Sequence, residues 1–311
     1  MGIESILGLF TVEFFFATVR MASPITLAAL GEVYLEKAGI LNLGLEATML
    51  MGAFFGVLGS ALSGSALVGL LTALLAGALT GLLFGFLVIT MRANQIVTGA
   101  ALNIAALGLT SFLSRIIFGI RALPVQVAGI DPWPVPVLSQ IPFIGRVLFE
   151  QTPLVYFTYF MVIVMTFVLY RTTWGLKIRA VGEHPRAADT VGINVFRWRY
   201  GCVLLNGALG GLAGSILSLA QLTTFVDNMT AGRGFIALAA VIFGRWNPLG
   251  AAGAALIFGA ADAVQMRVQA FSLNIPTDML LMLPYLITLI GVILFRGRAA
   301  SPVALTKPYE K

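Results

Sequence analysis

The sequence is short of charge. Only 10% of its 311 residues are Asp, Glu, Lys or Arg, whereas 59% are hydrophobic, and the mean hydropathy is +0.97. Soluble domains carry about 25% charged residues, so a water-soluble globular protein is excluded. Disordered chains are rich in charge and poor in apolar residues, which excludes disorder as well. What remains is a membrane protein with several spans of about 20 residues each.

Cysteine, histidine and lysine are also scarce. The single cysteine, Cys202, cannot form an intrachain disulfide, and the lone His184 offers no histidine-rich metal site. The chain contains no Gly-x-x-x-x-Gly-Lys-Ser/Thr phosphate loop. We therefore expect that it binds no cofactor, does not hydrolyse ATP by itself and is not an enzyme; if it pumps, another subunit supplies the energy.

Long stretches without charge mark the membrane spans. Together with an opening segment, Ile6 to Val33, these stretches predict an all-α polytopic membrane bundle of about nine helices (eight to ten) in a single domain, 1–311. One stretch, Gly234–Gly244, is too short to cross about 30 Å of hydrocarbon at 1.5 Å per residue, so it is either a half-helix or borrows residues around Arg233. The stretches are 47–91, divided near Gly59–Ser65, then 93–114, 151–170, 200–226, 234–244, 246–261 and 279–295.

Basic residues predict the orientation. The connection at 172–199 with its flanking Arg171, and the tail at 297–311 with its flanking Arg296, hold much of the Lys and Arg. Cytoplasmic loops are enriched in these residues, so both segments are predicted to be cytoplasmic. The proline-rich segment 119–152 and the N-terminus are then extracytoplasmic. The basic excess is a topology signal, and we expect membrane lipid rather than nucleic acid as a partner.

A few polar side chains fall at membrane depth, where an unpaired polar group is costly. One interpretation is hydrogen bonding between helices; the other is a pathway for a neutral polar solute, lined by amides that donate and accept hydrogen bonds. Glu13 and Arg20 are either an interfacial pair or a further polar lining. Buried acids are few and no histidine is central, which argues against a proton relay. The candidate pathway residues are Asn42, Glu46, Asn94, Asn103 and Asn206.

Small residues concentrate at 206–214 and 250–255. In lipid, small residues allow helix backbones to approach closely, so we interpret these segments as packing faces within the bundle. A subunit interface or a moving helix is the alternative.

The basic connection contains signals for a short helix. His184 is placed as the N-cap, Pro185 at the first helical position and Gly192 as a left-handed C-terminal residue. They predict about two turns over 184–191, too short to be stable unless another surface holds them. This helix is either an ordered turn or a docking element. The segment comprises Gly182, Glu183, His184, Pro185, Arg186, Ala187, Ala188, Asp189 and Gly192.

Three motifs resemble one family, the permease subunits of bacterial ABC importers of the branched-chain amino acid, ribose and nucleoside type. The pattern at 182–193 is similar to the family's coupling helix, although His184 stands where Asn is more common. Residues 36–46, followed by 49–55, resemble the signature of nucleoside and simple-sugar permeases, and 91–96 also resembles the family.

The resemblance implies a permease subunit of the bacterial inner membrane, with nucleosides as the first choice of solute and a simple sugar as the second. It further implies partner ATP-binding cassette subunits that use ATP and Mg, a second and different permease chain (a heterodimer), and an extracytoplasmic substrate-binding lipoprotein. Two rivals stay open. One is an ion-coupled secondary carrier, and the other is a membrane scaffold that transports nothing.

Overall fold

The computed structural model describes residues 11–119, 125–270, 282, 286 and 301–310, and all regular elements in these ranges are helices. Seven of the described helices are long and apolar enough to cross a membrane. The predicted last span, 279–295, lies outside the described residues apart from 282 and 286. The seven are α2 (Val12–Lys37), α3 (Leu45–Ser63), α4 (Ala66–Gly85) continued by the π-helix η1 (Phe86–Thr90), α5 (Gln95–Phe118), α7 (Pro153–Arg171), α10 (Val195–Ser215) continued by the π-helix η3 (Ile216–Gln221), and α12 (Pro248–Ala270).

Shorter helices connect these spans. α11 (Arg233–Phe243) has 11 residues, about 16 Å of helix, so the half-helix predicted around 234–244 is confirmed. α9 (Pro185–Thr190) is the predicted short helix, with Pro185 at its start and φ of +83° at Gly192. The sequence analysis did not predict α8 (Thr173–Glu183), which is capped by the Thr172 hydroxyl. The remaining short elements are η2 (Leu138–Gln140) and α6 (Ile144–Phe149).

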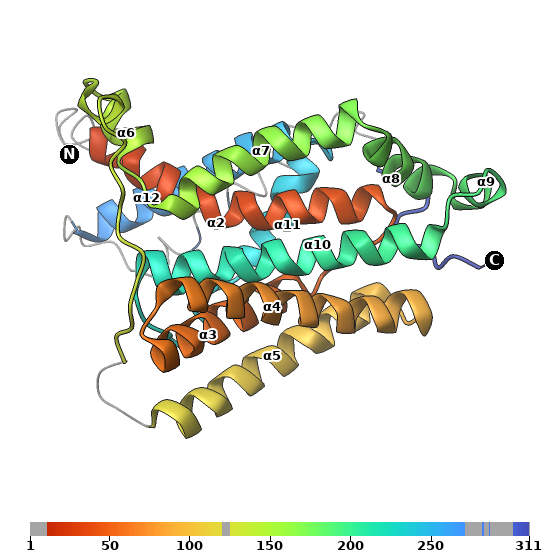
Figure 1. The fold of residues 1–311 in the computed structure, drawn as a ribbon, viewed down its shortest axis with the longest axis horizontal. Coiled ribbons are helices and arrows are strands. Elements are labelled where there is room, and N and C mark those ends of the chain that lie inside the picture. The colour runs from red at the N-terminus through yellow and green to blue at the C-terminus, as the bar shows by residue number, and fades with distance from the viewer. Residues whose placement is uncertain (1–10, 120–124, 271–281, 283–285, 287–300, 311) are drawn as a thin grey trace.

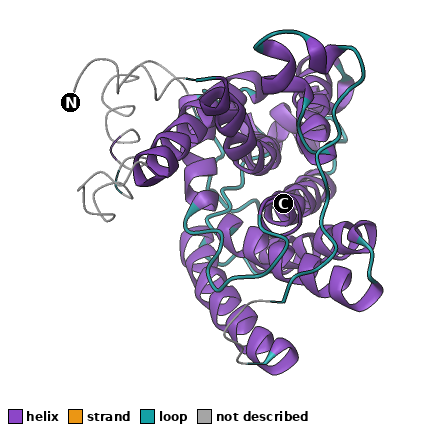
Figure 2. Ribbon diagram, turned by 90° about the vertical axis from the view of Figure 1, so that its left-hand side faces the viewer, coloured by secondary structure: helices purple, strands orange, loops and turns teal. Residues whose placement is uncertain are grey.

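The long helices lie side by side along the long axis of the molecule (Figure 1). One end of the bundle, here named the α6 end, carries α6 and the described start of α2. The opposite end, named the α9 end, carries α8, α9 and the tail 301–310. The loop after α5 covers the α6 end, where the Val127 and Ile130 amides donate to the Thr223 and Leu219 carbonyls. Figure 2, viewed from the α6 end, shows the described chain as helices and loops.

α10 forms the centre of the bundle and packs against α2, α3 and α4. Glycines make this packing close. A Cβ at Gly211 would collide with the Ala73 carbonyl oxygen of α4, and one at Gly214 with the Met49 carbonyl oxygen of α3. Such backbone contact supplies dispersion energy where lipid provides little hydrophobic force. The packing interpretation of 206–214 is confirmed.

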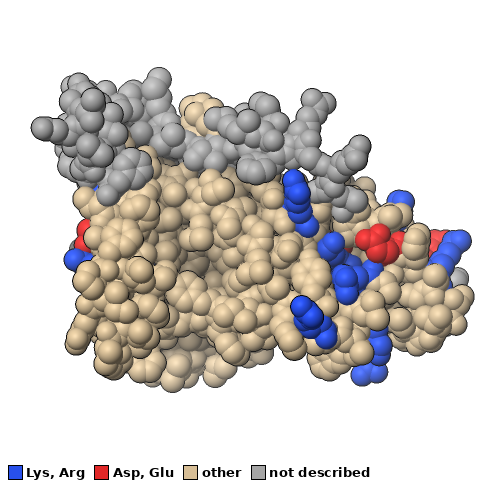
Figure 3. Space-filling view, turned by 90° about the horizontal axis from the view of Figure 1, so that it is seen from above, with Lys and Arg blue, Asp and Glu red and all other residues tan. Residues whose placement is uncertain are grey.

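The outward faces of the helices are apolar. Large side chains such as Leu79 on α4 and Ile163 on α7 are more than 60% exposed. On the face shown in Figure 3, the middle carries almost no charge, and Lys and Arg gather toward the α9 end. Exposed apolar surface of this extent is unfavourable in water and favourable in lipid. The chain is therefore a multi-pass membrane protein.

Candidate functional site

A cavity of about 920 Å³ opens among α2, α3, α5, α11, α12 and the irregular segment 222–232. Its size falls in the range of small-molecule sites, about 300–1,000 Å³. Apolar side chains form much of the wall, and a limited set of polar groups projects into it. The polar side chains lining it are Arg20, Glu46, Asn103, Gln221, Asn228, Arg233, Asp262 and Gln265.

Two of the five predicted pathway residues, Glu46 and Asn103, line this cavity. The Asn103 amide joins α5 to the start of α3, because its Nδ2 donates to the Leu43 carbonyl at 2.9 Å and its Oδ1 accepts from the Ala47 amide at 2.9 Å. Asn103 therefore fixes one wall of the cavity by bonds to the backbone.

Asn42 and Asn206 lie elsewhere, in a closed cluster with Glu32 that we name the polar knot. All three side chains are 0% exposed. Glu32 accepts from the Asn42 backbone amide at 2.9 Å and from Asn206 Nδ2 at 2.7 Å, and Asn42 Nδ2 donates to Asn206 Oδ1 at 2.8 Å. The knot ties α2, α10 and the α2–α3 connection together. Its polar groups satisfy one another, which fits the interhelical interpretation of these two asparagines.

Asn94 is an exposed N-cap at the α9 end. Its Oδ1 accepts from the Ile96 amide at 2.9 Å and from the Val97 amide at 3.2 Å. The structure places it at the start of α5, away from the cavity lining. Its sequence position before a charge-free run is equally consistent with a helix cap.

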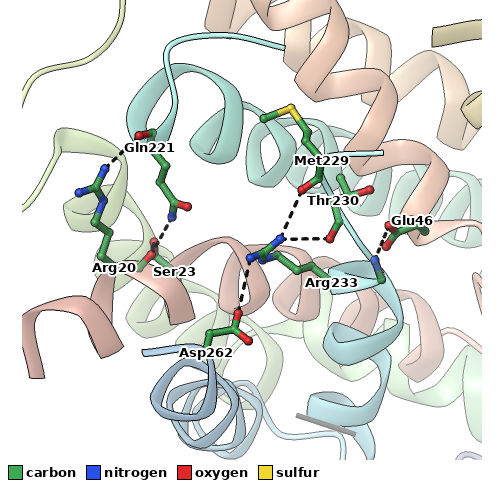
Figure 4. A network of polar contacts seen from close by, with 9 residues as sticks. Arg20, Ser23, Glu46, Gln221, Met229, Thr230, Arg233 and Asp262 are labelled. Atoms are coloured by element: carbon green, nitrogen blue, oxygen red, sulfur yellow. Dashed lines mark hydrogen bonds and ion pairs between the residues drawn. The ribbon is translucent and has the colours of Figure 1, made fainter. Parts of the chain in front are cut away.

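The irregular segment between η3 and α11 is held by side chains of α2, α3 and α11 (Figure 4). At its start, Arg20 Nη2 donates to the Gln221 carbonyl at 3.3 Å, and Gln221 Nε2 donates to the Arg20 carbonyl at 3.0 Å. At its end, Glu46 accepts from the Gly232 amide at 2.8 Å and from the Gly234 amide at 2.6 Å. The segment is therefore bounded by α2 at one end and α3 at the other.

An ion pair crosses from α11 to α12. Arg233 Nη2 lies 3.6 Å from Asp262 Oδ2, and Arg233 Nη1 also donates to the Met229 and Thr230 carbonyls. Sequence reasoning offered Arg20 as a polar lining but missed Arg233 and Gln221 as lining residues. The signal for Arg233 was its position directly before the short apolar stretch, with Asp262 in the following span.

Charge in the cavity is compensated. Arg233 pairs with Asp262. The Glu46 carboxylate accepts hydrogen bonds from two backbone amides at the positive end of the α11 helix dipole. Arg20 donates to backbone carbonyls. Paired charges together with amide side chains suit a neutral polar solute better than an ion. Among the described residues, no group of three or more His, Cys, Asp and Glu is placed to hold a metal ion.

α9 presents two different faces at its end of the bundle. Ala188 is buried against Val181, Val195 and Tyr309, whereas Ala187 and Arg186 are exposed. His184 occupies the N-cap position but its side chain makes no capping bond. The buried face packs on neighbouring residues and so supplies the supporting surface that a helix this short was expected to need. The exposed face is accessible for contact.

The tail 301–310 lies against α8 and α9. The Ala304 amide donates to the Gly182 carbonyl at 3.0 Å, and Glu310 pairs with Arg92 at 2.8 Å. Burial raises the pKa of the Tyr309 phenol, and the Asp189 carboxylate raises it further, so this ring is neutral at physiological pH. A groove of about 690 Å³ lies between the start of α9 and part of the tail. It is lined by residues 183–187, 303, 304 and 307–310.

Residues 14–292 match the family described as branched-chain amino acid transport system / permease component. The chain is 40% identical over 307 residues to the guanosine ABC transporter permease protein NupQ of Bacillus subtilis, covering 95% of each chain. It is 40% identical to the nucleoside ABC transporter permease protein NupC of Lactococcus lactis, covering 91% of this chain and 92% of the other.

A third relative is the putative glucose ABC transporter permease protein TsgC13 of Haloferax volcanii, 38% identical over 83% of this chain and 78% of the other. No solved structure matches the chain.

Proposed function

Because the chain belongs to the branched-chain amino acid transport system / permease component family, we propose that it is the membrane-spanning permease subunit of an ATP-driven ABC importer for nucleosides. The observation that carries this proposal is the 40% identity, over 95% of both chains, to a permease named for guanosine. A match over nearly the whole length includes the cavity, α9 and the motif at 36–46.

The cavity supports this class of solute. A nucleoside is neutral, carries hydroxyl and ring groups that donate and accept hydrogen bonds, and has a flat apolar base. The wall offers Asn103, Gln221 and Asn228 beside Ile104, Leu107 and Met266. Amides recognise both donors and acceptors, and the apolar side chains accommodate the base.

A simple sugar is the second candidate. It is favoured by the 38% identity to a putative glucose permease. A simple sugar has hydroxyl groups but no flat apolar surface, so it would bind at the polar side of the same cavity.

The family match also supports a proposal for the energy source and the partners. The chain has no phosphate loop, so ATP and Mg would be used by separate ATP-binding cassette subunits. We propose that these contact α9 and move it as a lever, shifting the spans between inward-open and outward-open states. A second, different permease chain and an extracytoplasmic lipoprotein receptor would complete the importer.

We further propose nine crossings with the N-terminus outside and the α9 end in the cytoplasm of a bacterial cell. Segment 222–243 would supply one crossing as coil followed by half-helix, and 279–295 would supply the last. In support, the described tail lies at the same end of the bundle as α9, which fits a cytoplasmic location for both.

Uptake of labelled guanosine, adenosine and ribose in cells with and without the gene tests the proposal. We expect gene-dependent, ATP-dependent uptake of the nucleosides. Ribose uptake alone would support the sugar permease. Uptake by the purified chain in liposomes under an ion gradient, without an ATPase, would support a secondary carrier. Unchanged uptake on deletion would support a scaffold.

A further inference from the structure

The half-helix α11 is held at both ends by carboxylates that flank one short connection, the residues 38–44 between α2 and α3. At the first end, Glu46 of α3 accepts from the Gly232 and Gly234 amides. At the other end, Trp246 Nε1 donates to Glu36 of α2. Both carboxylates are buried, with exposures of 8% and 1%. Hydrogen bonds between buried groups are costly to break, so any displacement of the connection acts on α11.

The same connection is in direct contact with the segment that carries α9. Gly182, at the end of α8, lies so close to Lys37 that a Cβ there would collide with the Lys37 carbonyl oxygen. Arg199, at the start of α10, donates from Nε to the Ala38 carbonyl at 3.2 Å. Backbone packed on backbone leaves little room for independent motion, so displacement of 182–185 displaces 37–39.

The first turn of α11 borders the cavity. Gly232, Arg233 and Ile236 are part of the lining. The segment leading into it takes positive φ at Thr223, Asn228, Ala231 and Gly232. Left-handed backbone at residues other than glycine is costly and is maintained by the surroundings, so this segment changes shape readily when its end moves.

We propose that the α2–α3 connection is the relay between α9 and the cavity. Glu46, Glu36 and Trp246 are the residues that position α11. Their hydrogen bonds hold α11 in place. This inference rests on the proposed function, since it needs a partner that pushes on α9. The motion runs from Gly182 through Lys37 and Ala38 to the two carboxylates, and from them to the first turn of α11.

The test uses the complete importer reconstituted in proteoliposomes and measures guanosine taken up per ATP hydrolysed. We expect Glu46→Gln to keep ATP hydrolysis but lower that ratio about tenfold, because it removes a charged acceptor from two amides. Trp246→Phe removes one donor and should lower the ratio less. A structural defect that only reduced the amount of protein would lower uptake and hydrolysis together and leave the ratio unchanged.

Tyr34→Phe is the matched control. It removes a buried hydrogen bond from Tyr34 Oη to the Met165 carbonyl, which joins α2 to α7 and does not touch α11. An unchanged ratio in both Glu46→Gln and Trp246→Phe, or an equal fall in Tyr34→Phe, would overturn the relay. If Glu46→Gln does not assemble, Trp246→Phe decides alone. Absence of ATP-dependent uptake in the wild type would instead refute the proposed function.

Discussion

Two groups of polar side chains lie within the helix bundle, and their surroundings differ. In the polar knot, Glu32, Asn42 and Asn206 are fully buried and bond to one another. Around the cavity, Glu46, Asn103, Arg233 and Asp262 line open space while bonding to neighbouring helices. Both groups use carboxylates and amides, so residue type does not separate structure from pathway. What separates them is whether a solute has room to reach them.

The largest expected effect breaks the knot. Glu32→Ala would leave the Asn42 amide and the Asn206 Nδ2 group buried without an acceptor, at a cost of about 1–3 kcal/mol each. We expect a strong loss of folded protein, measured as membrane abundance and as the unfolding temperature in detergent. The control is Glu13→Ala, which breaks an exposed pair with Arg146 and should cost about 1 kcal/mol at most. Equal stability of the two variants would contradict a closed knot.

The second prediction addresses the cavity. Asp262→Asn removes the partner of Arg233, which retains two carbonyl acceptors and access to water in the cavity. We expect normal abundance with uptake reduced about tenfold, equivalent to about 1.4 kcal/mol. The exchange variant Arg233→Asp with Asp262→Arg should recover part of that loss. Loss of abundance in Asp262→Asn would place this pair with the knot rather than with the pathway.

The third prediction separates the two faces of α9. Ala187→Glu adds a charge to the exposed face, so uptake should fall sharply while membrane insertion and the unfolding temperature stay unchanged. Ala188→Glu buries a carboxylate against Val181, Val195 and Tyr309, so it should lower the unfolding temperature as well. Normal ATP-dependent uptake in Ala187→Glu would refute the lever role of α9.

The smallest expected effect is at Asn94. Asn94→Ala removes a helix cap worth about 1 kcal/mol. The unfolding temperature should fall slightly and guanosine uptake per ATP should stay the same. A large change in solute affinity would instead support the prediction that Asn94 is a pathway residue.

Local signals in the sequence predicted local structure well. Charge-free runs located the described spans other than α2. His184, Pro185 and Gly192 bounded α9, and the glycines of 206–214 marked the face that packs on α3 and α4. Each of these depends on periodicity, on capping or on residue size within one segment, which a single sequence contains.

The pathway was harder to predict because it depends on contacts between distant segments. Asn42 and Glu46 are four residues apart, yet the α2–α3 connection buries the first in the knot and leaves the second at the cavity. The pairing of Arg233 with Asp262, and of Arg92 with Glu310, is likewise set by tertiary packing. Residue type alone carries no information about such placement.

Thiol reactivity distinguishes the pathway from the knot most directly. Cysteine is placed at Leu107, which lines the cavity, or at Asn42, in the knot, and is treated with a small water-soluble thiol reagent; native Cys202 is buried. We predict that the Leu107→Cys variant reacts and that guanosine slows the reaction, whereas the Asn42→Cys variant stays unreactive. The account would be contradicted if the Asn42→Cys variant reacted and guanosine slowed that reaction, while guanosine had no effect on the reaction of the Leu107→Cys variant.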